Sequence, residues 1–294
     1  MSGTSPAAGF SPWLTRAAAS EAPVLILGEA GSGRSTLARA LHQASPRAAG
    51  PLVELDCGAV PVSLFESELF GHQKGAFTGA DRAVPGRVAR AEGGTLVLDR
   101  VEALPLSVQP KLLRLLAEKR YAPLSGRERS ADVRFVAISE EDLTRRVERG
   151  SFRADLFYRL EVLSLRLPPL RERRPEIPAL AVELVADLAA RMGMAAPPIA
   201  DASLAWMGRH AWPGNLRQLK NLLERALILH GEGPLEVPVP AGAAEAPPRP
   251  LAVVEAEEIR RTLAYVRDHQ GKAAELLGIS RKSLWEKRKR YGIP

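Results

Sequence analysis

The chain has 294 residues, of which 46% are hydrophobic and 26% are charged. This composition is typical of folded globular protein and excludes wholesale disorder, and the length predicts two folded units. The single cysteine, Cys57, excludes an intramolecular disulfide and a cysteine-based zinc site, and it favours a reducing compartment, so a cytoplasmic location is expected. No apolar stretch approaches the ~18 residues of a spanning helix, and the first ten residues lack the pattern of a signal peptide, so no membrane contact is expected.

The positive charge of the chain is concentrated near its C-terminal end. Basic residues outnumber acidic ones by 41 to 34, for a net charge of +7. The segment 281–290 alone, RKSLWEKRKR, contains six basic residues and one acidic residue. Clustered charge of this kind favours a polyanionic partner, so the C-terminal end is expected to face a polyanion.

Five short apolar segments alternate with helical patterns in the first half of the chain. We predict strands at 24–27, 52–55, 95–98, 133–138 and 162–167. Segments that are apolar along their length are typical of strands covered on both faces. The predicted fold class is therefore α/β, with a parallel sheet and crossover helices.

The remainder of the chain divides into helical segments and a spacer. Helical patterns at 175–192, 201–209 and 213–230 predict a small helical subdomain, and the Pro- and Ala-rich segment that follows is typical of a semi-rigid linker. Only about 20 residues precede the first strand, so no sensory domain is expected there. We place the α/β domain at 1–168, the helical subdomain at 169–231, the linker at 232–250 and a C-terminal domain at 251–294.

A glycine-rich segment follows the first predicted strand and leads into a helical pattern, the context of a phosphate-binding loop. Glycines allow the backbone N–H groups to approach phosphate oxygens closely. The segment fits the pattern G-x-x-x-x-G-K-[ST] except that arginine stands in place of lysine. A glycine-rich turn without a ligand is the alternative. The predicted nucleotide-binding residues are Gly28, Glu29, Ala30, Gly31, Ser32, Gly33, Arg34, Ser35 and Thr36.

Two residues are candidates for binding Mg²⁺. Ser35 has the hydroxyl that the loop pattern directs to the metal. Asp99 ends an apolar strand, GGTLVLD, at the place of the metal-binding aspartate of P-loop nucleoside triphosphatases. For Asp99 a turn-forming or helix-capping role is the alternative.

The segment 66–81, ESELFGHQKGAFTGAD, resembles the bacterial enhancer-binding proteins, the AAA+ activators of sigma-54 RNA polymerase. The resemblance covers roughly 24–229 and 251–293. It implies an AAA+ fold with a helical lid, ATP and Mg²⁺ as cofactors, and a homo-oligomeric ring, hexamer or heptamer, formed from DNA-bound dimers. It further implies that one loop contacts sigma-54, through Gly75, Ala76, Phe77, Thr78, Gly79 and Ala80.

The resemblance also implies three catalytic arginines beside Asp99. The segment FRADLFYR matches the family's subunit-boundary arginines and gives Arg153 and Arg159, which stabilise phosphoryl charge on a neighbouring subunit. The segment WPGNLR matches the lid motif whose arginine senses nucleotide and gives Arg217. A helix start with a solvated arginine is the alternative for Arg217.

Three positions depart from the family pattern. Arg34 replaces lysine in the loop, Arg100 replaces the glutamate that follows Asp99, and Glu140 replaces the asparagine of the first sensor. The missing glutamate orients or deprotonates the attacking water, and Glu102 is the nearby candidate for a substitute base. Two functions therefore remain open: a hydrolysing sigma-54 activator, and a non-hydrolysing AAA+ regulator that binds DNA and acts as partner or antagonist of a competent activator.

The C-terminal domain carries a helix-turn-helix pattern that resembles the Fis-type domain of enhancer-binding proteins. Helices are predicted at 272–278 and 281–291, with a preceding helix at 253–268 that is expected to form a dimer contact. Trp285 is expected in the apolar core, and a merely solvated basic helix is the alternative to a DNA-binding one. The predicted residues for double-stranded DNA are Ser280, Arg281, Lys282, Ser283, Lys287, Arg288 and Arg290, the last three of them nearer phosphates.

Overall fold

The computed structural model describes residues 11–231, 233–237, 251–266 and 269–293. It separates into two compact units, which comprise residues 1–238 and 239–294, and each is described by itself. Within the described residues, no helix has both the length and the apolar character that crossing a membrane requires. Most of the expected linker, 232 and 238–250, lies outside the described residues.

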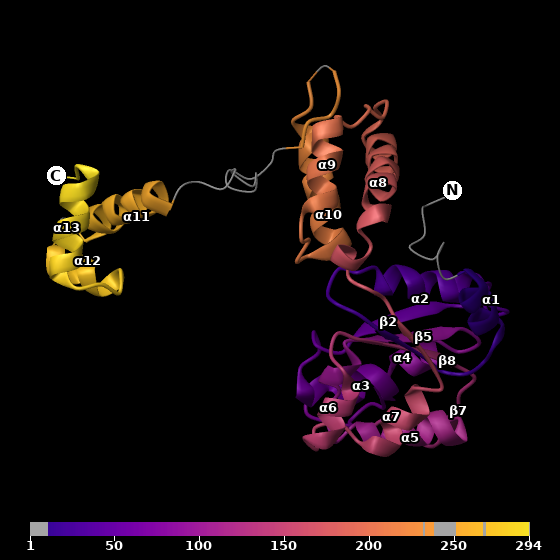
Figure 1. The fold of residues 1–294 in the computed structure, drawn as a ribbon. Helices are drawn as coiled ribbons and strands as arrows, with labels where there is room; N and C mark the ends of the chain where they lie inside the picture. The colour runs from indigo at the N-terminus through magenta and orange to yellow at the C-terminus, as the bar shows by residue number, and fades with distance from the viewer. Residues whose placement is uncertain (1–10, 232, 238–250, 267–268, 294) are drawn as a thin grey trace. The chain divides into compact units, whose positions relative to one another are not determined.

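A five-stranded parallel sheet forms the centre of the first unit, as the sequence predicts (Figure 1). The strands lie in the order β2-β5-β8-β1-β9. Their bounds are β1 Val24–Leu27, β2 Leu52–Asp56, β5 Thr95–Asp99, β8 Arg134–Ser139 and β9 Leu163–Arg166. Two short antiparallel hairpins accompany the sheet, β3 (Gly71–His72) with β4 (Val84–Pro85) and β6 (Arg120–Tyr121) with β7 (Arg129–Ser130).

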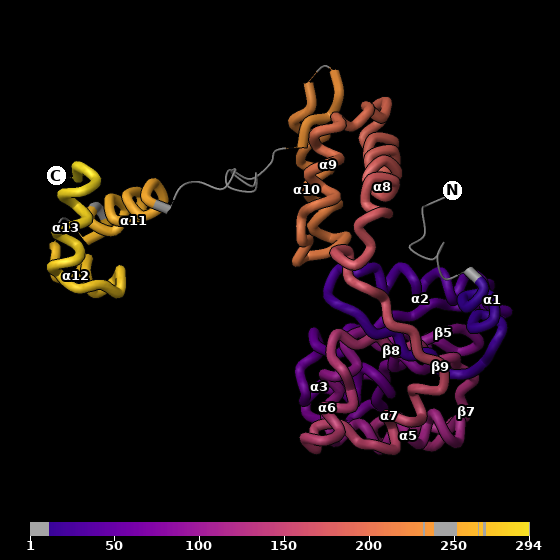
Figure 2. The backbone as a smooth tube through the Cα atoms, in the orientation of Figure 1, coloured from indigo at the N-terminus to yellow at the C-terminus, as the bar shows by residue number. Residues whose placement is uncertain are grey.

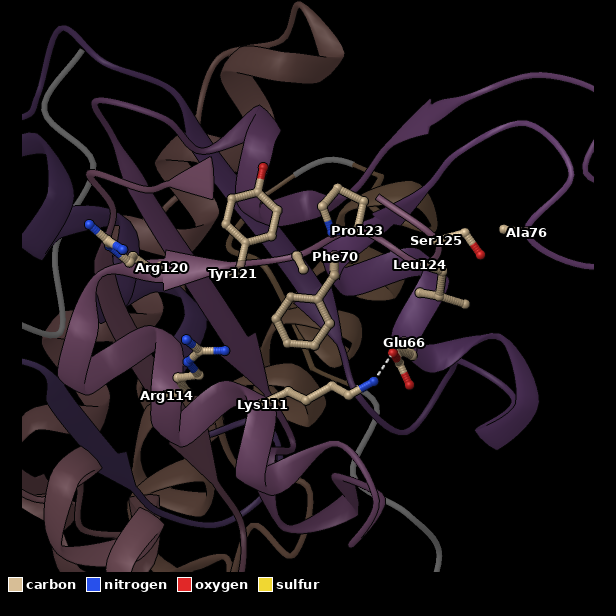
Figure 3. Close-up of a pocket in the computed structure, with 11 residues that line it drawn as sticks. Glu66, Phe70, Ala76, Lys111, Arg114, Arg120, Tyr121, Pro123, Leu124 and Ser125 are labelled. Atoms are coloured by element: carbon tan, nitrogen blue, oxygen red, sulfur yellow. Dashed lines mark hydrogen bonds and ion pairs between the residues drawn. The ribbon is translucent and has the colours of Figure 1, made fainter. Parts of the chain in front are cut away.

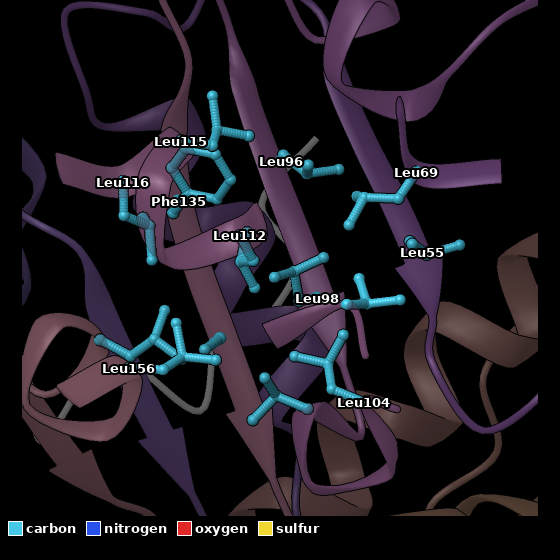
Figure 4. Packing of buried hydrophobic residues seen from close by; sticks show 14 of the residues in the cluster. Leu55, Leu69, Leu96, Leu98, Leu104, Leu112, Leu115, Leu116, Phe135 and Leu156 are labelled. Atoms are coloured by element: carbon cyan, nitrogen blue, oxygen red, sulfur yellow. The ribbon is translucent and has the colours of Figure 1, made fainter. Parts of the chain in front are cut away.

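Successive side chains of the central strands enter two different cores, because a strand directs its residues to alternate faces of a sheet. Leu96 and Phe135 enter the core shown in Figure 4, whereas Val97 and Val136 enter the core on the opposite face. The helices of the α/β part are α1 Ser11–Ala19, α2 Arg34–Gln43, α3 Val62–Phe70, α4 Arg87–Arg90, α5 Gln109–Glu118, α6 Leu143–Glu148 and α7 Ala154–Leu160. Helices α1 and α2 cover the second core, and α3 to α7 cover the first.

The two edge strands differ from the sequence prediction. In β9 the residues are alternately half-buried and exposed, and in β2 only Leu55 is fully buried. The expectation that every strand is covered on both faces is therefore wrong at the edges, because an edge strand has a neighbour on one side only and lies at the margin of the helix layers. It holds for β5 and β8, whose residues are buried almost throughout.

A buried arginine joins β8 to the end of α1. The side chain of Arg134 is almost fully buried, and its guanidinium donates hydrogen bonds of 2.9 and 2.6 Å to the carbonyl oxygens of Ala18 and Ala17. These carbonyls belong to the last turn of α1, where helix carbonyls lack partners and a cation is favoured. Burial lowers the pKa of Arg134 below its usual value. Arg134 thus fixes α1 against the sheet.

Three helices form the lid that the sequence predicts after the sheet. The segment after β9 leads to α8 (Ile177–Met192), and α9 (Asp201–Arg209) and α10 (Asn215–Ile228) follow (Figure 2). Leu235 and Val237, inside the range expected to be linker, are buried instead. The backbone of Leu235 pairs with that of Ile199, between α8 and α9. The lid therefore extends beyond residue 231.

Three helices, α11 (Leu251–Tyr265), α12 (Gln270–Leu276) and α13 (Arg281–Tyr291), make up the second unit. Their apolar side chains form a small core that includes Ile259, Leu263 and Leu284. The hydroxyl of Ser280 accepts the N–H of Ser283 and so caps α13, as its position before the helix predicts.

The expectation that Trp285 belongs to this core is wrong. Its side chain is 57% exposed, and the ammonium of Lys289 lies 5.5 Å from the centre of its ring. The preceding residue, Leu284, takes the core position instead. Successive helix residues point about 100° apart, so only one of the two can face α11 and α12.

Candidate nucleotide-binding site

The carboxyl ends of the parallel strands bring Asp99, the start of the predicted phosphate-binding loop and Glu140 to one edge of the sheet. Gly28 follows β1, Asp99 ends β5, and Glu140 follows β8. Asp56 at the end of β2 lies in register with Asp99, and Leu27 at the end of β1 lies in register with Ser139. In open α/β sheets, ligands bind outside this edge.

A cleft of about 1120 Å³ opens at this edge between the loop after β1 and the lid. Eight of the predicted site residues line the cleft, namely Ala30, Gly31, Gly33, Arg34, Ser35, Thr36, Asp99 and Arg217. Sequence reasoning missed the contribution of α8, whose Leu180, Leu184, Asp187, Leu188 and Arg191 line the lid side. Their spacing of three and four residues was the signal for one helix face, but it did not show what that face covers.

The loop between β1 and α2 has the backbone of a phosphate-binding loop. Gly31 and Gly33 have φ angles of 75° and 104°, in the left-handed region that favours glycine. No side chain caps the first turn of α2, so its N–H groups remain available to an anion. A Cβ on Gly31 would lie 2.5 Å from the carbonyl oxygen of Gly214, so glycine is required for the loop to approach the lid.

Glu29 fixes the loop to the lid and does not line the cleft. Its carboxylate accepts two hydrogen bonds from Arg171, of 2.7 and 2.6 Å, and one of 3.2 Å from the amide of Asn215. The same amide donates to the carbonyl oxygen of Ala30. The hydrogen bonds from Arg171, and then that from Asn215, lower the pKa of Glu29 to about 2. Loop and lid are thus joined through one carboxylate.

Two of the three departures from the family pattern form an ion pair with each other. Arg34 is buried, and its guanidinium donates a 2.6 Å bond to the carboxylate of Glu140. A second donor of the same guanidinium bonds the carbonyl oxygen of Gly28 at 2.8 Å. The arginine at the lysine position and the glutamate at the asparagine position therefore compensate each other's charge.

Arg100, the third departure, is also paired. Its guanidinium donates two bonds, of 2.8 and 2.6 Å, to the carboxylate of Asp56, and this contact lowers the pKa of Asp56. A Cβ on Gly58 would lie 2.5 Å from the Arg100 guanidinium carbon, so glycine leaves room for the side chain. Asp99 accepts the backbone N–H of Arg100 at 2.9 Å. Arg100 is thus directed toward the edge strand β2.

Glu102, the candidate for a substitute base, does not line the cleft. It is buried, and one carboxylate oxygen accepts the backbone N–H of Glu140 at 3.2 Å. Its other oxygen is buried without a hydrogen-bond partner. The geometry therefore makes Glu102 a support for the backbone of Glu140.

Ser35 and Asp99 fit the requirements of a magnesium ion that accompanies nucleotide phosphates. Both line the cleft, and Mg²⁺ is usually held by one or two protein groups together with phosphate oxygens and water. Within the described part of the chain, no group of three or more His, Cys, Asp or Glu side chains has a metal-binding arrangement. The donor set thus fits a metal that arrives with a nucleotide.

The two boundary arginines lie away from the cleft of their own chain. Arg153 precedes α7 and makes two hydrogen bonds to Asp155, and Arg159 lies in the last turn of α7 and bonds the carbonyl oxygen of Leu116. Neither lines the cleft. This placement agrees with residues that act on another subunit.

The GAFTGA segment is the tip of the β3–β4 hairpin. Gly75 and Gly79 have positive φ angles with open space around them, and the N–H of Gly75 bonds the carbonyl oxygen of Ala80 at 2.8 Å. The side chain of Phe77 is 40% exposed, with its ring centre 4.9 Å from that of His72. The tip is therefore a closed turn whose phenylalanine rests on the first strand of the hairpin.

A second, smaller pocket of about 340 Å³ is lined by residues of α3, α5, β6 and the segment after β6, together with Ala76 of the GAFTGA segment (Figure 3). Phe70 and Tyr121 form its apolar part, and Lys111 forms an ion pair with Glu66 at its rim. Leu124 joins the two hairpins, because its backbone N–H bonds Gly71 and its carbonyl accepts from Gln73. The β3–β4 hairpin is thus held at its base, while its tip projects.

The basic residues of α13 are arranged less uniformly than the sequence suggests. Lys287 bonds the carboxylate of Glu255 on α11, which also accepts the hydroxyl of Tyr291. Arg281 lies over α12, where a Cβ on Gly271 would be 2.6 Å from its guanidinium. Lys282 is exposed. The charge of Lys287 is therefore matched within the unit.

Comparison with protein families identifies the chain. It belongs to the family of the sigma-54 interaction domain, whose model matches residues 8–166. A model described as an AAA+ ATPase lid domain matches residues 171–239, and one described as a bacterial regulatory protein of the Fis family matches residues 250–291. The resemblance to enhancer-binding proteins and the predicted fold class are confirmed.

Individual relatives include transcriptional regulators. The C4-dicarboxylate transport transcriptional regulatory protein DctD of Rhizobium meliloti (strain 1021) is 42% identical over 95% of this chain and 61% of its own length. The Nif-specific regulatory protein of Azotobacter vinelandii is 40% identical over 92% of this chain and 54% of its own length. The chain thus spans less than two thirds of either relative.

Among solved structures, NtrX from Brucella abortus in complex with ATP superimposes with a TM-score of 0.76 at 31% identity. The match covers 99% of this chain and 69% of NtrX. A structure of NtrX in complex with ADP gives the same TM-score.

Replacing Glu29 by Gln is expected to destabilise the first unit in a pH-dependent way. Because the pKa of Glu29 is lowered from 4.5 to about 2, its stabilisation is present above pH 4.5 and is lost as the pH falls toward 2. The loss at neutral pH is expected to be at most about 1 kcal/mol, because both partners are substantially exposed. Calorimetric melting at pH 7 and pH 3 measures it, with Glu148→Gln as the control for losing a surface charge. A melting difference that does not shrink at pH 3 would contradict the role of the Glu29 carboxylate.

Proposed function

We propose that this protein is a sigma-54-dependent transcription regulator that binds ATP between subunits, contacts sigma-54 through the Phe77 hairpin, and binds DNA through α13. The observation that carries the proposal is the half-exposed Phe77 at the glycine-flanked tip of a hairpin whose base is fixed. A large aromatic group held out from a rigid base suits a protein contact, because aromatic residues are frequent anchors of interfaces.

The cleft supports binding of an adenine nucleotide with Mg²⁺. The loop offers uncapped N–H groups and the Arg34 guanidinium to phosphates, while Ser35 and Asp99 face the same space for the metal. NtrX, a structural neighbour, has been solved in complex with ATP and with ADP. When bound, the metal would neutralise phosphate charge and help to orient the phosphates.

The placement of the boundary arginines supports assembly into a ring. Arg153 and Arg159 do not line the cleft of their own chain, which leaves them to act on the nucleotide of a neighbouring subunit in the proposed assembly. We propose a homo-oligomer, hexamer or heptamer, built from DNA-bound dimers in the cytoplasm, in which Arg217 of the lid senses the nucleotide.

The comparisons bear on the two functions that the sequence left open. They do not favour the non-hydrolysing regulator, because the matched family models and the named relatives belong to sigma-54-type transcriptional regulators. The substitutions at residues 34, 100 and 140 leave the loop, the lid and the hairpin in place. We therefore propose that these substitutions tune the nucleotide chemistry of an activator.

Replacing Phe77 by Ala is expected to weaken capture of sigma-54 at least about tenfold, because a buried aromatic anchor supplies much of the energy of an interface. Capture of purified sigma-54 by the immobilised full chain, with a non-hydrolysable ATP analogue, measures the effect. Leu106→Ala removes another half-exposed apolar side chain and serves as the matched control. Equal capture by the Phe77 variant, the Leu106 variant and the wild type would overturn the proposed role of the hairpin.

DNA binding is proposed for Ser280, Arg281, Lys282, Ser283, Lys287, Arg288 and Arg290, with unequal contributions. Arg290→Ala is expected to lower the slope of log affinity against log salt by roughly one, as loss of one phosphate contact does, because Arg290 is exposed. Lys287→Ala is expected to lower the slope by less, because Glu255 already matches its charge. Fluorescence titration of a random-sequence duplex at several salt concentrations measures both slopes. An equal loss of slope would show that the Lys287–Glu255 pair opens on DNA.

A further inference from the structure

In the nucleotide cleft, the Glu140 carboxylate is bonded to the Arg34 guanidinium, which is the cation that a phosphate chain would bind. Arg34 stands at the loop position whose side chain reaches the β- and γ-phosphates in phosphate-loop proteins. One of its donors bonds Glu140 at 2.6 Å and another bonds the Gly28 carbonyl at 2.8 Å. The Glu140 carboxylate and an incoming phosphate therefore require the same guanidinium.

The two partners differ in how firmly they are held. The Arg34 side chain is only 7% exposed and is anchored on the loop backbone, whereas the Glu140 side chain is 38% exposed and lines the cleft. The backbone of Glu140 is fixed by Glu102, but within the described part of the chain its carboxylate makes one hydrogen bond, to Arg34. When a phosphate arrives, the carboxylate is the group that can leave, while Arg34 stays in place.

We propose that Glu140 is an internal competitor for nucleotide phosphates, and that its displacement from Arg34 sets the nucleotide affinity of this chain. The inference deepens the proposed function, because it assumes that the cleft takes up an adenine nucleotide. Without nucleotide, Glu140 supplies the opposite charge to a buried guanidinium, whose other hydrogen-bond partner, the Gly28 carbonyl, is neutral, and a buried charge without a counter-charge is costly. With nucleotide, the β- and γ-phosphates take over that role and the carboxylate turns to water.

The chemistry of the ligand follows from the position of Arg34. An adenosine moiety or an α-phosphate does not reach the guanidinium, so Glu140 does not oppose adenosine or AMP. ADP and ATP carry the phosphates that compete with Glu140. The competition thus acts on nucleoside di- and triphosphates and makes the cleft sensitive to phosphate-chain length.

Replacing Glu140 by Gln removes the competing charge and tests the inference. The variant is expected to bind ATP and ADP roughly tenfold more tightly or better, in the range set by charge-assisted hydrogen bonds, and to bind AMP as the wild type does. Isothermal titration of the full chain with ATP, ADP and AMP, each with Mg²⁺, measures the affinities. Nucleotide is also expected to raise the melting temperature of the variant more than that of the wild type.

Glu183→Gln is the matched control. Glu183 is an exposed carboxylate on α8 that does not line the cleft, so the variant removes one negative charge by the same substitution without touching Arg34. It is expected to change ATP affinity by less than about threefold, because an exposed charge is screened at physiological salt. If the Glu140→Gln variant is poorly folded without nucleotide, the double variant Arg34→Lys/Glu140→Asn takes its place. It removes the ion pair between residues 34 and 140 and leaves a shorter cation at residue 34.

The outcomes separate the inference from the proposed function. If the wild type binds ATP and Glu140→Gln binds it no more tightly, or gains as much for AMP as for ATP, internal competition is overturned while nucleotide binding stands. An equal gain in Glu183→Gln would reduce the effect to general electrostatics and would likewise overturn it. If neither the wild type nor any variant binds a nucleotide, both the inference and the nucleotide part of the proposed function fail.

Discussion

A charge that is withdrawn from water needs an opposite charge in contact, and this constraint acts on the buried guanidinium of Arg34, which meets it through Glu140. Two further ion pairs stand around the cleft, Arg100 with Asp56 and Glu29 with Arg171, but their side chains are substantially exposed. Arg34 begins α2 and Glu140 follows β8, while Arg100 follows β5 and Asp56 ends β2, so both pairs depend on the order of strands in the sheet. The departures at residues 34 and 140 compensate each other's charge in the structure.

The same contacts connect the nucleotide loop to the rest of the unit. Glu29 and Asn215 join the loop to the lid, and Gly31 allows the two backbones to touch. Residues that line the cleft come from both the sheet edge and α8, so a ligand bound there contacts both parts. On the other side of the sheet, the Phe77 hairpin has a fixed base and a projecting tip. Through these contacts between loop and lid, a nucleotide bound in the cleft can affect the position of the lid.

The sequence predicted the five strands, the lid helices, the loop residues of the cleft and Asp99, because apolar periodicity and glycine spacing are local signals. Arg217 came from the resemblance of WPGNLR to the lid motif of the family. It did not predict that Arg34 faces Glu140 or that Arg100 turns to Asp56, because both depend on the order of strands in the sheet. Trp285 was misplaced for a related reason: its neighbour Leu284 was equally apolar, and only packing against α11 decided between them.

The most direct test measures the rate at which the double variant Arg100→Glu/Asp56→Asn releases phosphate from ATP. It asks whether the Arg100–Asp56 ion pair governs the chemistry of the cleft. The second substitution prevents two carboxylates from facing each other, and Asp56→Asn alone is the control. A carboxylate restored after Asp99 is expected to raise the rate by about 100-fold or more, as a positioned general base does. A double variant that releases phosphate no faster than the wild type or than Asp56→Asn would contradict this role of Arg100.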